Sequence, residues 1–190
     1  GMFVAGLFQK ATEHEVTELV NCPDVTEIKL EINNEIIRFS SCTVDEYERS
    51  YNTKTGEVIE SGIWKTRNGI SVKISLRAFA SLFNRHFWCQ KMELELLNAD
   101  SAKVCVEAGI NGQITNSGVS HFRNTECRVY EKKIMHYKGI MDENKLDIYE
   151  KIKIKGLEDE DVNKKFVLKR RSIYQNNKFI LKKGHVIRYV

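Results

Sequence analysis

The chain has 190 residues, of which 42% are hydrophobic and 29% charged, and its formal net charge is +4. This composition is ordinary for a soluble globular protein of one large or two small domains. No stretch reaches the roughly 20 apolar residues of a membrane-spanning helix, and no basic region precedes the apolar residues after Met2, so we expect neither a membrane partner nor a secretory leader.

The first predicted element along the chain is also the only helical candidate. In TEHEVTELVN, residues 12–21, the apolar residues Val16, Leu19 and Val20 recur at the spacing of one helix face. We expect a single turn or a short helix there.

From about residue 26 onward, apolar residues alternate with polar ones almost throughout, which is the pattern of half-buried β-strands. The longest apolar face is predicted for ISVKISLRAFASL, residues 70–82, where every second residue from Ile70 to Leu82 is apolar. Turn residues separate the runs. They predict hairpins at Asn33-Asn34, 54–56, 67–69 and Asn176-Asn177, and a further turn at Gly184.

The stretch EAGINGQITNSGV, residues 107–119, holds two turn signals where one hairpin needs only one. They are Asn111-Gly112 and Asn116-Ser117-Gly118. We expect the first turn to reverse the chain and the second to bend it away. Asn116 is expected to fix the loop through an Asx-turn.

Positive charge gathers near the end of the chain, with twelve Lys and Arg against four Asp and Glu in residues 151–190. In YEKIKIKG, residues 149–156, the lysines alternate with Ile152 and Ile154, and Ile148 shares the parity of the isoleucines. This pattern predicts a strand with one dry and one wet face, on which lysines keep the sheet soluble. We therefore expect no nucleic-acid partner.

These patterns predict one all-β domain over residues 1–190, with little helix. About a dozen antiparallel strands favour a large two-sheet β-sandwich, because open twisted sheets rarely exceed about 10 strands without folding over. A barrel is the second choice.

Cysteine and histidine spacing predicts neither disulfides nor a metal site. The five cysteines are widely spaced without a C-x-x-C motif, which favours a reducing compartment and hence a cytoplasmic location. The five histidines lack metal-ligand spacing and are interpreted as structural or surface residues. We expect no metal and no cofactor.

No catalytic motif is recognisable in the sequence. It has no nucleophile elbow, no phosphate-binding glycine loop and no H-E-x-x-H. The acidic run EDED, residues 158–161, is interpreted as a solvated turn, because adjacent like charges repel one another. From the residues alone, the chain is a β-sandwich without visible chemistry.

Four segments, in order, resemble the N-terminal domain of glycoside hydrolase family 65, the family of maltose, kojibiose and trehalose phosphorylases. They are FVAGLFQK with ELVNCPD (3–10 and 18–24), RAFASLFNRHFWCQKMELEL (77–96), AGINGQITNSGV (108–119) and the closing strand 180–190. The resemblance covers almost the whole chain and implies a large antiparallel super-sandwich. The family's upstream Gly-rich run and its helical barrel, which carries the general-acid Glu and the phosphate site, are missing here.

The resemblance implies a non-catalytic domain that packs on the catalytic barrel of a disaccharide phosphorylase or glycosidase and supports dimers. The alternative is a stand-alone carbohydrate-binding module, for which Trp64 is the aromatic candidate because its strand reads as polar and exposed. Trp88 is expected in the core. A disaccharide or oligosaccharide is the expected small-molecule partner.

Arg85 and His86 match the family's Arg-His and are candidates for the contact with the barrel, near the cleft. Together with Asn116 and Trp64 they are our candidates for carbohydrate binding or the domain interface. The alternative is structural: Arg85 would hold its corner by donating to backbone carbonyls. Around this corner the core can take only some of the apolar side chains, so we expect a surface patch and a possible homo-oligomer. The patch residues are Leu82, Phe83, Phe87 and Trp88.

Overall fold

The computed structural model describes residues 2–10, 13–141 and 144–190. The described residues form sixteen strands and one 3-10 turn, η1 (Asp159–Asp161). The strands are β1 (Met2–Gln9), β2 (Glu18–Cys22), β3 (Ile28–Ile32), β4 (Glu35–Ile36), β5 (Thr43–Asn52), β6 (Glu57–Lys65), β7 (Ser71–Ala80), β8 (Trp88–Leu96), β9 (Ser101–Asn111), β10 (Arg123–Tyr130), β11 (Ile134–Met141), β12 (Asn144–Lys151), β13 (Ile154–Lys155), β14 (Asn163–Lys169), β15 (Ser172–Lys182) and β16 (Val186–Tyr189).

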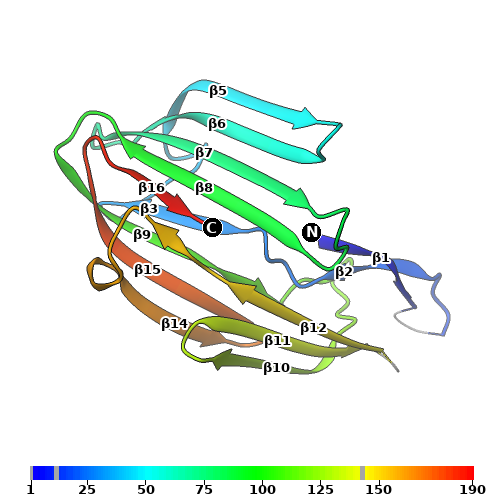
Figure 1. The fold of residues 1–190 in the computed structure, drawn as a ribbon. Helices are drawn as coiled ribbons and strands as arrows, with labels where there is room; N and C mark the ends of the chain where they lie inside the picture. The colour runs from blue at the N-terminus through cyan, green and yellow to red at the C-terminus, as the bar shows by residue number, and fades with distance from the viewer. Residues whose placement is uncertain (1, 11–12, 142–143) are drawn as a thin grey trace. The chain divides into compact units, whose positions relative to one another are not determined.

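The strands form sheets of the order β13-β16-β8-β7-β6-β5, β14-β15-β9-β3-β4, β10-β11-β12 and β1-β2 (Figure 1). Neighbours such as β6 and β7, or β7 and β8, pair antiparallel over most of their length. The prediction of an all-β, antiparallel sandwich with little helix is confirmed.

The chain folds into two compact units. The first contains Gly1–Ile28, Glu107–Lys151 and Lys164–Asn176, and the second contains Lys29–Val106, Ile152–Asn163 and Asn177–Val190. Strands β9 and β15 each run along the chain from one unit into the other. A single domain over residues 1–190 stays a prediction.

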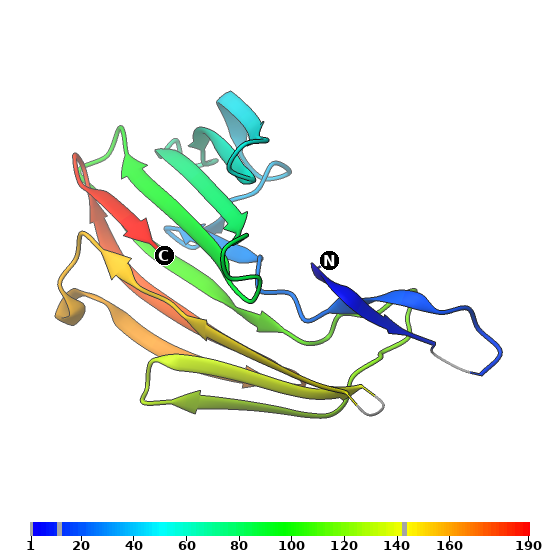
Figure 2. The same ribbon diagram turned by 45° about the vertical axis from the view of Figure 1, so that its right-hand side comes forward.

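The core of the second unit lies between two layers of strands. Cross-strand neighbours share a face, so the buried side chains of β7 and β8, such as Val72 and Leu94, line one layer. Buried residues of the other layer include Leu30 on β3 and Val104 on β9. The second unit is therefore a sandwich, whose two layers can be followed in Figure 2.

The first unit has its own apolar cluster. Val20 and Cys22 of β2 are fully buried and pack with Phe122 and Met141. The partly buried Met2, Leu7 and Leu146 pack against this cluster. The hairpin of β1 and β2 is thereby joined to β11 and β12 by hydrophobic contacts.

Several predicted hairpins are confirmed, and their turn residues show why. Asn33 and Asn34 between β3 and β4 have φ of 48° and 66°, the left-handed conformation that a two-residue hairpin requires. Gly56 connects β5 with β6 and Gly69 connects β6 with β7, with φ of 69° and 80°. The predicted turn at Gly184 separates β15 from β16.

The helix predicted at residues 12–21 is wrong. Residues 11–12 lie outside the described residues, a turn follows at 13–15, and β2 begins at Glu18. Val20 and Cys22 are both fully buried, two residues apart, so burial follows the strand period. Val16, which set the helical spacing, is exposed.

The hairpin predicted at Asn176-Asn177 is also wrong, because β15 continues straight through it. Asn177 is fully buried, and its Nδ2 donates a hydrogen bond to Tyr189 Oη on β16 at 3.0 Å. The bond satisfies a buried amide inside the strand, so no turn is needed. The actual connection is Arg170-Arg171 between β14 and β15, where Arg171 has a φ of 58°.

The single strand predicted over YEKIKIKG is divided in two. β12 ends at Lys151 and pairs with β11, whereas β13 begins at Ile154 and pairs with β16. The predicted parity survives, because Ile152 and Ile154 are half-buried and Lys151 is exposed. The alternation of Ile and Lys therefore predicted which residues face the interior. It did not predict that the chain leaves the sheet of β11 and joins the sheet of β16.

The Asn177 bond predicts a specific cost. We expect Asn177→Ala to lower the free energy of unfolding by about 1–3 kcal/mol, because the Tyr189 hydroxyl loses a buried donor. Urea unfolding followed by tyrosine fluorescence measures it. Asn176→Ala is the control, since Asn176 Oδ1 accepts no hydrogen bond from the described residues. Equal losses in the two variants would contradict this assignment.

Candidate functional site

The corner between β7 and β8 exposes the apolar residues that the sequence singled out. Phe83 is fully exposed, and the exposed fractions of Leu82, Phe87 and Trp88 are 84%, 59% and 38%. These four exposed apolar side chains lie along one turn of the second unit and are here named the corner patch.

Polar residues of the corner hold this arrangement. Ser81 Oγ accepts a hydrogen bond from Asn84 N at 3.0 Å, and Asn84 Oδ1 accepts one from His86 N at 3.2 Å. Backbone bonds from Ser81 N to Phe87 O at 2.9 Å and from Phe87 N to Asn84 O at 3.0 Å close the loop. These hydrogen bonds satisfy polar groups of the turn within the turn itself. The apolar side chains of the turn remain exposed to solvent.

Two expectations about the corner need correction. Trp88 was expected in the core, but it pairs with Ala80 at the far end of β7 and β8, beyond the buried stretch, and stays partly exposed. The structural alternative for Arg85, that it holds the corner, is not supported: its side chain is exposed, and Ser81 and Asn84 make the closing bonds. His86 is exposed as well, so both side chains of the Arg-His pair face solvent.

Trp64 is not the exposed platform that its polar-looking strand predicted. It is only 6% exposed, and its cross-strand partner on β7 is the buried Val72. The indole packs against the rings of Phe39 and Tyr47, at centroid distances of 5.9 and 6.2 Å. Trp64 thus supports the core rather than presenting a free face.

Asn116 ties its loop to β2 in the first unit. Its Oδ1 accepts a hydrogen bond from Asn21 N at 2.8 Å, and its Nδ2 donates to Leu19 O at 2.9 Å. The expected Asx-turn is therefore corrected: the side chain bridges to a strand about a hundred residues earlier. Asn21 Nδ2 returns a bond to Thr115 O at 3.2 Å.

The two turn signals of residues 107–119 have different roles. The tight reversal is the second one, where Ser117 and Gly118 have φ of 45° and 93° and the backbone of Asn116 pairs with Val119. A turn also follows β9 at residues 112–113, and its role in reversing the chain stays a prediction. At Gly112 a Cβ would overlap the Arg171 carbonyl and the Tyr137 ring, so glycine serves close packing there.

Two histidines are buried within polar clusters of the first unit. His121 Nε2 lies 2.8 Å from Glu18 Oε1, and its Nδ1 lies 3.2 Å from Gln9 Oε1. His136 Nε2 lies 2.9 Å from Asp147 Oδ1. Both are hydrogen-bonded structural histidines, as the spacing predicted.

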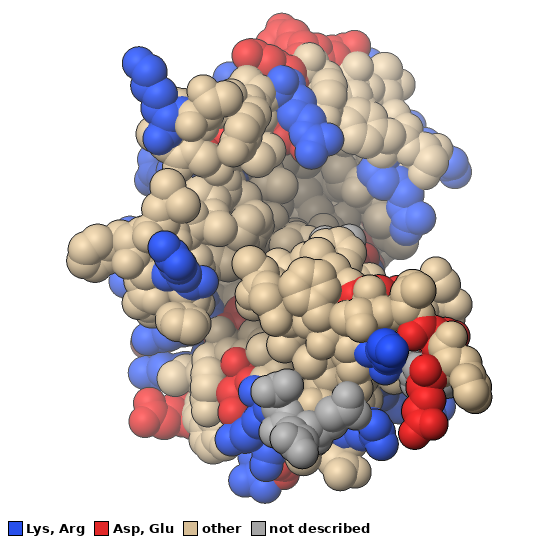
Figure 3. Space-filling view, turned by 90° about the vertical axis from the view of Figure 1, so that its right-hand side faces the viewer, with Lys and Arg blue, Asp and Glu red and all other residues tan. Residues whose placement is uncertain are grey.

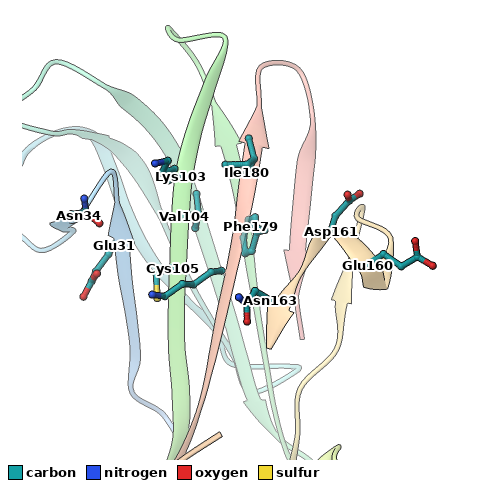
Figure 4. A pocket seen from close by; sticks show the side chains of 11 residues that line it. Glu31, Asn34, Lys103, Val104, Cys105, Glu160, Asp161, Asn163, Phe179 and Ile180 are labelled. Carbon is teal, nitrogen blue, oxygen red and sulfur yellow. The ribbon is translucent and has the colours of Figure 1, made fainter. Parts of the chain in front are cut away.

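A cavity of about 650 Å³ lies in the second unit, beside β3, β9 and β15 (Figure 4). Its charged lining combines acids with lysines: Glu31, Glu160, Asp161, Lys103 and Lys178. Glu160, Asp161 and both lysines are exposed to solvent. Because the lining carries charges of both signs and is exposed to solvent, the cavity can hold water or a small polar molecule.

Surface charge is mixed in sign. Figure 3 shows Lys and Arg interspersed with Asp and Glu over the face that it draws. Local pairs contribute to this mixing: Glu93 lies 2.8 Å from Arg188 and 3.0 Å from Lys91. Although burial opposes it, hydrogen bonds from these two cations keep the pKa of Glu93 below its ordinary value.

Glu150 on β12 is a titratable residue that the sequence analysis missed. Burial raises the pKa of its carboxyl from 4.5 to about 8, and its Oε2 has no hydrogen-bond partner among the described residues. Its cross-strand neighbour on β11 is the fully buried Met135. The sequence could have predicted this burial, because Glu150 has the same strand parity as the inward-facing Ile148 and Ile152.

Glu150 makes stability depend on pH in a defined direction. Below pH 4.5 the carboxyl is protonated in both states, and between about 4.5 and 8 only the unfolded state ionises, so rising pH favours unfolding. We expect Glu150→Gln to be more stable than wild type by an amount that grows by about 1.4 kcal/mol per pH unit in this window.

Urea unfolding at pH 5, 6 and 7 measures this difference. The exposed Glu48→Gln variant is the control and should show a constant difference from wild type. A Glu150→Gln difference that does not grow with pH would contradict the buried neutral carboxyl.

Among the described residues, no three His, Cys, Asp or Glu side chains are grouped as ligands of a metal ion. No helix in this part of the chain is long and apolar enough to cross a membrane. No disulfide joins the five cysteines, all of which are described.

Comparisons with known proteins agree with this architecture. A family model described as the N-terminal domain of glycosyl hydrolase family 65 matches residues 1–188. The kojibiose phosphorylase of Escherichia coli strain K12 is 29% identical over 189 residues, which are 98% of this chain and 24% of that enzyme. The kojibiose phosphorylase of Halothermothrix orenii is 35% identical over 129 residues, covering 68% of this chain and 16% of that enzyme.

A solved structure of a kojibiose phosphorylase candidate from the human microbiome shares the fold, with a TM-score of 0.75 at 13% identity. It covers 91% of this chain, which in turn covers 22% of that protein. The chain thus spans about a quarter or less of the length of these relatives. Because the family model matches nearly every residue, the chain belongs to the family of N-terminal domains of glycosyl hydrolase family 65.

Proposed function

We propose that the chain is the non-catalytic β-sandwich domain of a disaccharide phosphorylase and that it docks on the catalytic helical barrel through the corner patch. The observation that carries the proposal is the exposure of four large apolar side chains, Leu82, Phe83, Phe87 and Trp88, at one corner. Contiguous apolar surface on a domain usually marks an interaction site.

The length of the relatives supports a catalytic barrel as the partner that covers the corner patch. The kojibiose phosphorylases similar to this chain are about four or more times longer, so most of each enzyme lies outside the matched region. A domain of this family therefore has a large covalent neighbour available in its relatives. The exposed Arg85 and His86 flank the patch within the same turn and supply a polar rim, as interfaces commonly have.

The described carboxyl groups support a non-catalytic role. Inverting cleavage of a glycosidic bond needs a general acid whose proton reaches the leaving oxygen, with phosphate here in place of water. Glu150 has the raised pKa of such an acid, but it faces Met135 within the sheet. The Glu160 and Asp161 side chains are exposed and mixed with lysines at the cavity.

For the whole protein, the family suggests phosphorolysis of a glucosyl disaccharide such as kojibiose, which is the substrate in its relatives' names. We propose that the 190 residues work as one domain, that this domain shapes one rim of the active-site cleft and supports dimers, and that Asn116 contributes to carbohydrate binding or to the domain interface. The widely spaced cysteines favour a cytoplasmic location. The stand-alone module is less favoured, because its candidate platform Trp64 is buried.

Isolated from its barrel, the chain should bury the corner patch against another copy of itself. We expect sedimentation velocity to show concentration-dependent association of the wild type and a monomer for the Phe83→Ser, Phe87→Ser double variant. Both side chains are exposed, so the variant should fold normally.

Leu168→Ser is the matched control, because Leu168 is a similarly exposed apolar residue on β14, outside the corner. This variant should associate like the wild type. A wild type that stays monomeric at high concentration, or an equal effect of Leu168→Ser, would remove the main support for the docking role.

A further inference from the structure

One face of the sheet β10-β11-β12 carries a row of rings. Cross-strand register aligns Arg128 of β10, His136 of β11 and Tyr149 of β12, so their side chains project from the same face. Tyr130, two residues after Arg128, shares this parity. This aromatic row lies in the first unit and includes none of the residues discussed for docking.

His136 is the fixed centre of the row. Its ring is buried, Nε2 is 2.9 Å from Asp147 Oδ1, and Nδ1 is 3.5 Å from the Tyr130 hydroxyl. The Tyr130 ring lies 5.6 Å away at a tilt of 36°. These contacts hold the imidazole on both sides, so a ring stacked on it has a rigid support.

Tyr149 is that ring. It stacks on His136 with a centroid distance of 4.5 Å and an interplanar angle of 13°. One of its two faces is thereby covered. β12 is an edge strand of its sheet, and Tyr149 is nevertheless 63% exposed. The opposite face of Tyr149 is therefore open to solvent beyond the edge of the sheet.

Polar groups flank the open ring along β12. Asp147 and Lys151 lie two residues before and after Tyr149, on the same face of the strand. Asp147 Oδ2 is 2.8 Å from Lys145 Nζ, and this bond lowers the pKa of Asp147, which stays ionised and accepts hydrogen bonds. Lys145 and Lys151 are exposed donors.

We propose that Tyr149 is the platform of a surface binding site for a neutral pyranose unit of a di- or oligosaccharide. The C–H face of the sugar would stack on the open ring, while Asp147 accepts from its hydroxyls and Lys151 donates to them. Pyranoses combine an apolar face with a polar edge, which matches an aromatic ring bordered by charged groups.

A neutral ligand fits the charge of this surface. Asp147 offsets Lys145 directly, and Glu126 pairs with Arg128 beside the row, with Arg128 Nε 2.6 Å from Glu126 Oε1. An anionic ligand would gain little from Lys145 and Arg128, which already have acidic partners. The pre-formed stack also lowers the conformational cost of ordering the platform when the sugar binds.

The site can be tested by titrating the isotopically labelled 190-residue chain with kojibiose and with maltotriose, followed by amide chemical shifts. A one-ring platform should give a Kd on the order of 1–10 mM. We expect saturable shifts centred on residues 145–151. Tyr149→Phe should keep the Kd, because the hydroxyl is not needed for stacking, whereas Tyr149→Ala should weaken binding by at least about tenfold.

Tyr51→Ala is the matched control, because Tyr51 is 62% exposed on the edge strand β5 and its loss should leave the Kd unchanged. Three results would overturn the proposal: shifts that do not saturate with either sugar, an equal loss in Tyr51→Ala, or tighter binding of adenosine monophosphate at the same amides. The proposal does not rest on the docking function, so its failure would leave the corner patch argument intact.

Discussion

Pairing of β7 with β6 on one side and β8 on the other, over most of its length, is the constraint on which the second unit depends. The register holds from Lys65 opposite Ser71 to Ala80 opposite Trp88, so it decides which side of the layer each residue takes. Burial fills this side from Val72 to Ala78. Beyond Ala78, β7 and β8 extend past the buried core. The apolar residues of the corner patch, which follow, can contact only solvent or a partner.

The sequence predicted the fold where local chemistry decides it. Asn33-Asn34, Gly56 and Gly69 sit at turns because a left-handed backbone suits Asn and Gly, whatever the surroundings. The alternation of β7 predicted its buried face for the same local reason. These features need no knowledge of the rest of the chain.

Long-range contacts decided the features that the sequence did not predict. Asn177 reads as a turn residue, but it lies within β15, where its side chain is buried and donates to Tyr189 Oη. Asn116 reads as an Asx-turn, but its partners are on β2. Trp64 looked exposed because its strand is polar, yet rings from β5 and from the segment before it cover the indole. The alternation of apolar and polar residues along a strand carries no information about partners that lie far away in the sequence.

Three buried titratable groups of the first unit serve structure. His121 joins β1 and β2 to the loop before β10, and His136 supports the aromatic row. Glu150 is held neutral by burial at a cost to stability. This use of ionisable residues agrees with a domain that positions and binds while another domain reacts.

The docking claim is tested most directly by hydrogen exchange. Exchange would be compared between the 190-residue chain alone and the same domain joined to its catalytic barrel. We expect slower exchange at residues 81–88 in the joined protein, with unchanged exchange at the β5–β6 turn, residues 53–56. Equal exchange at residues 81–88 in the two proteins would contradict this expectation and show that the corner patch does not contact the barrel.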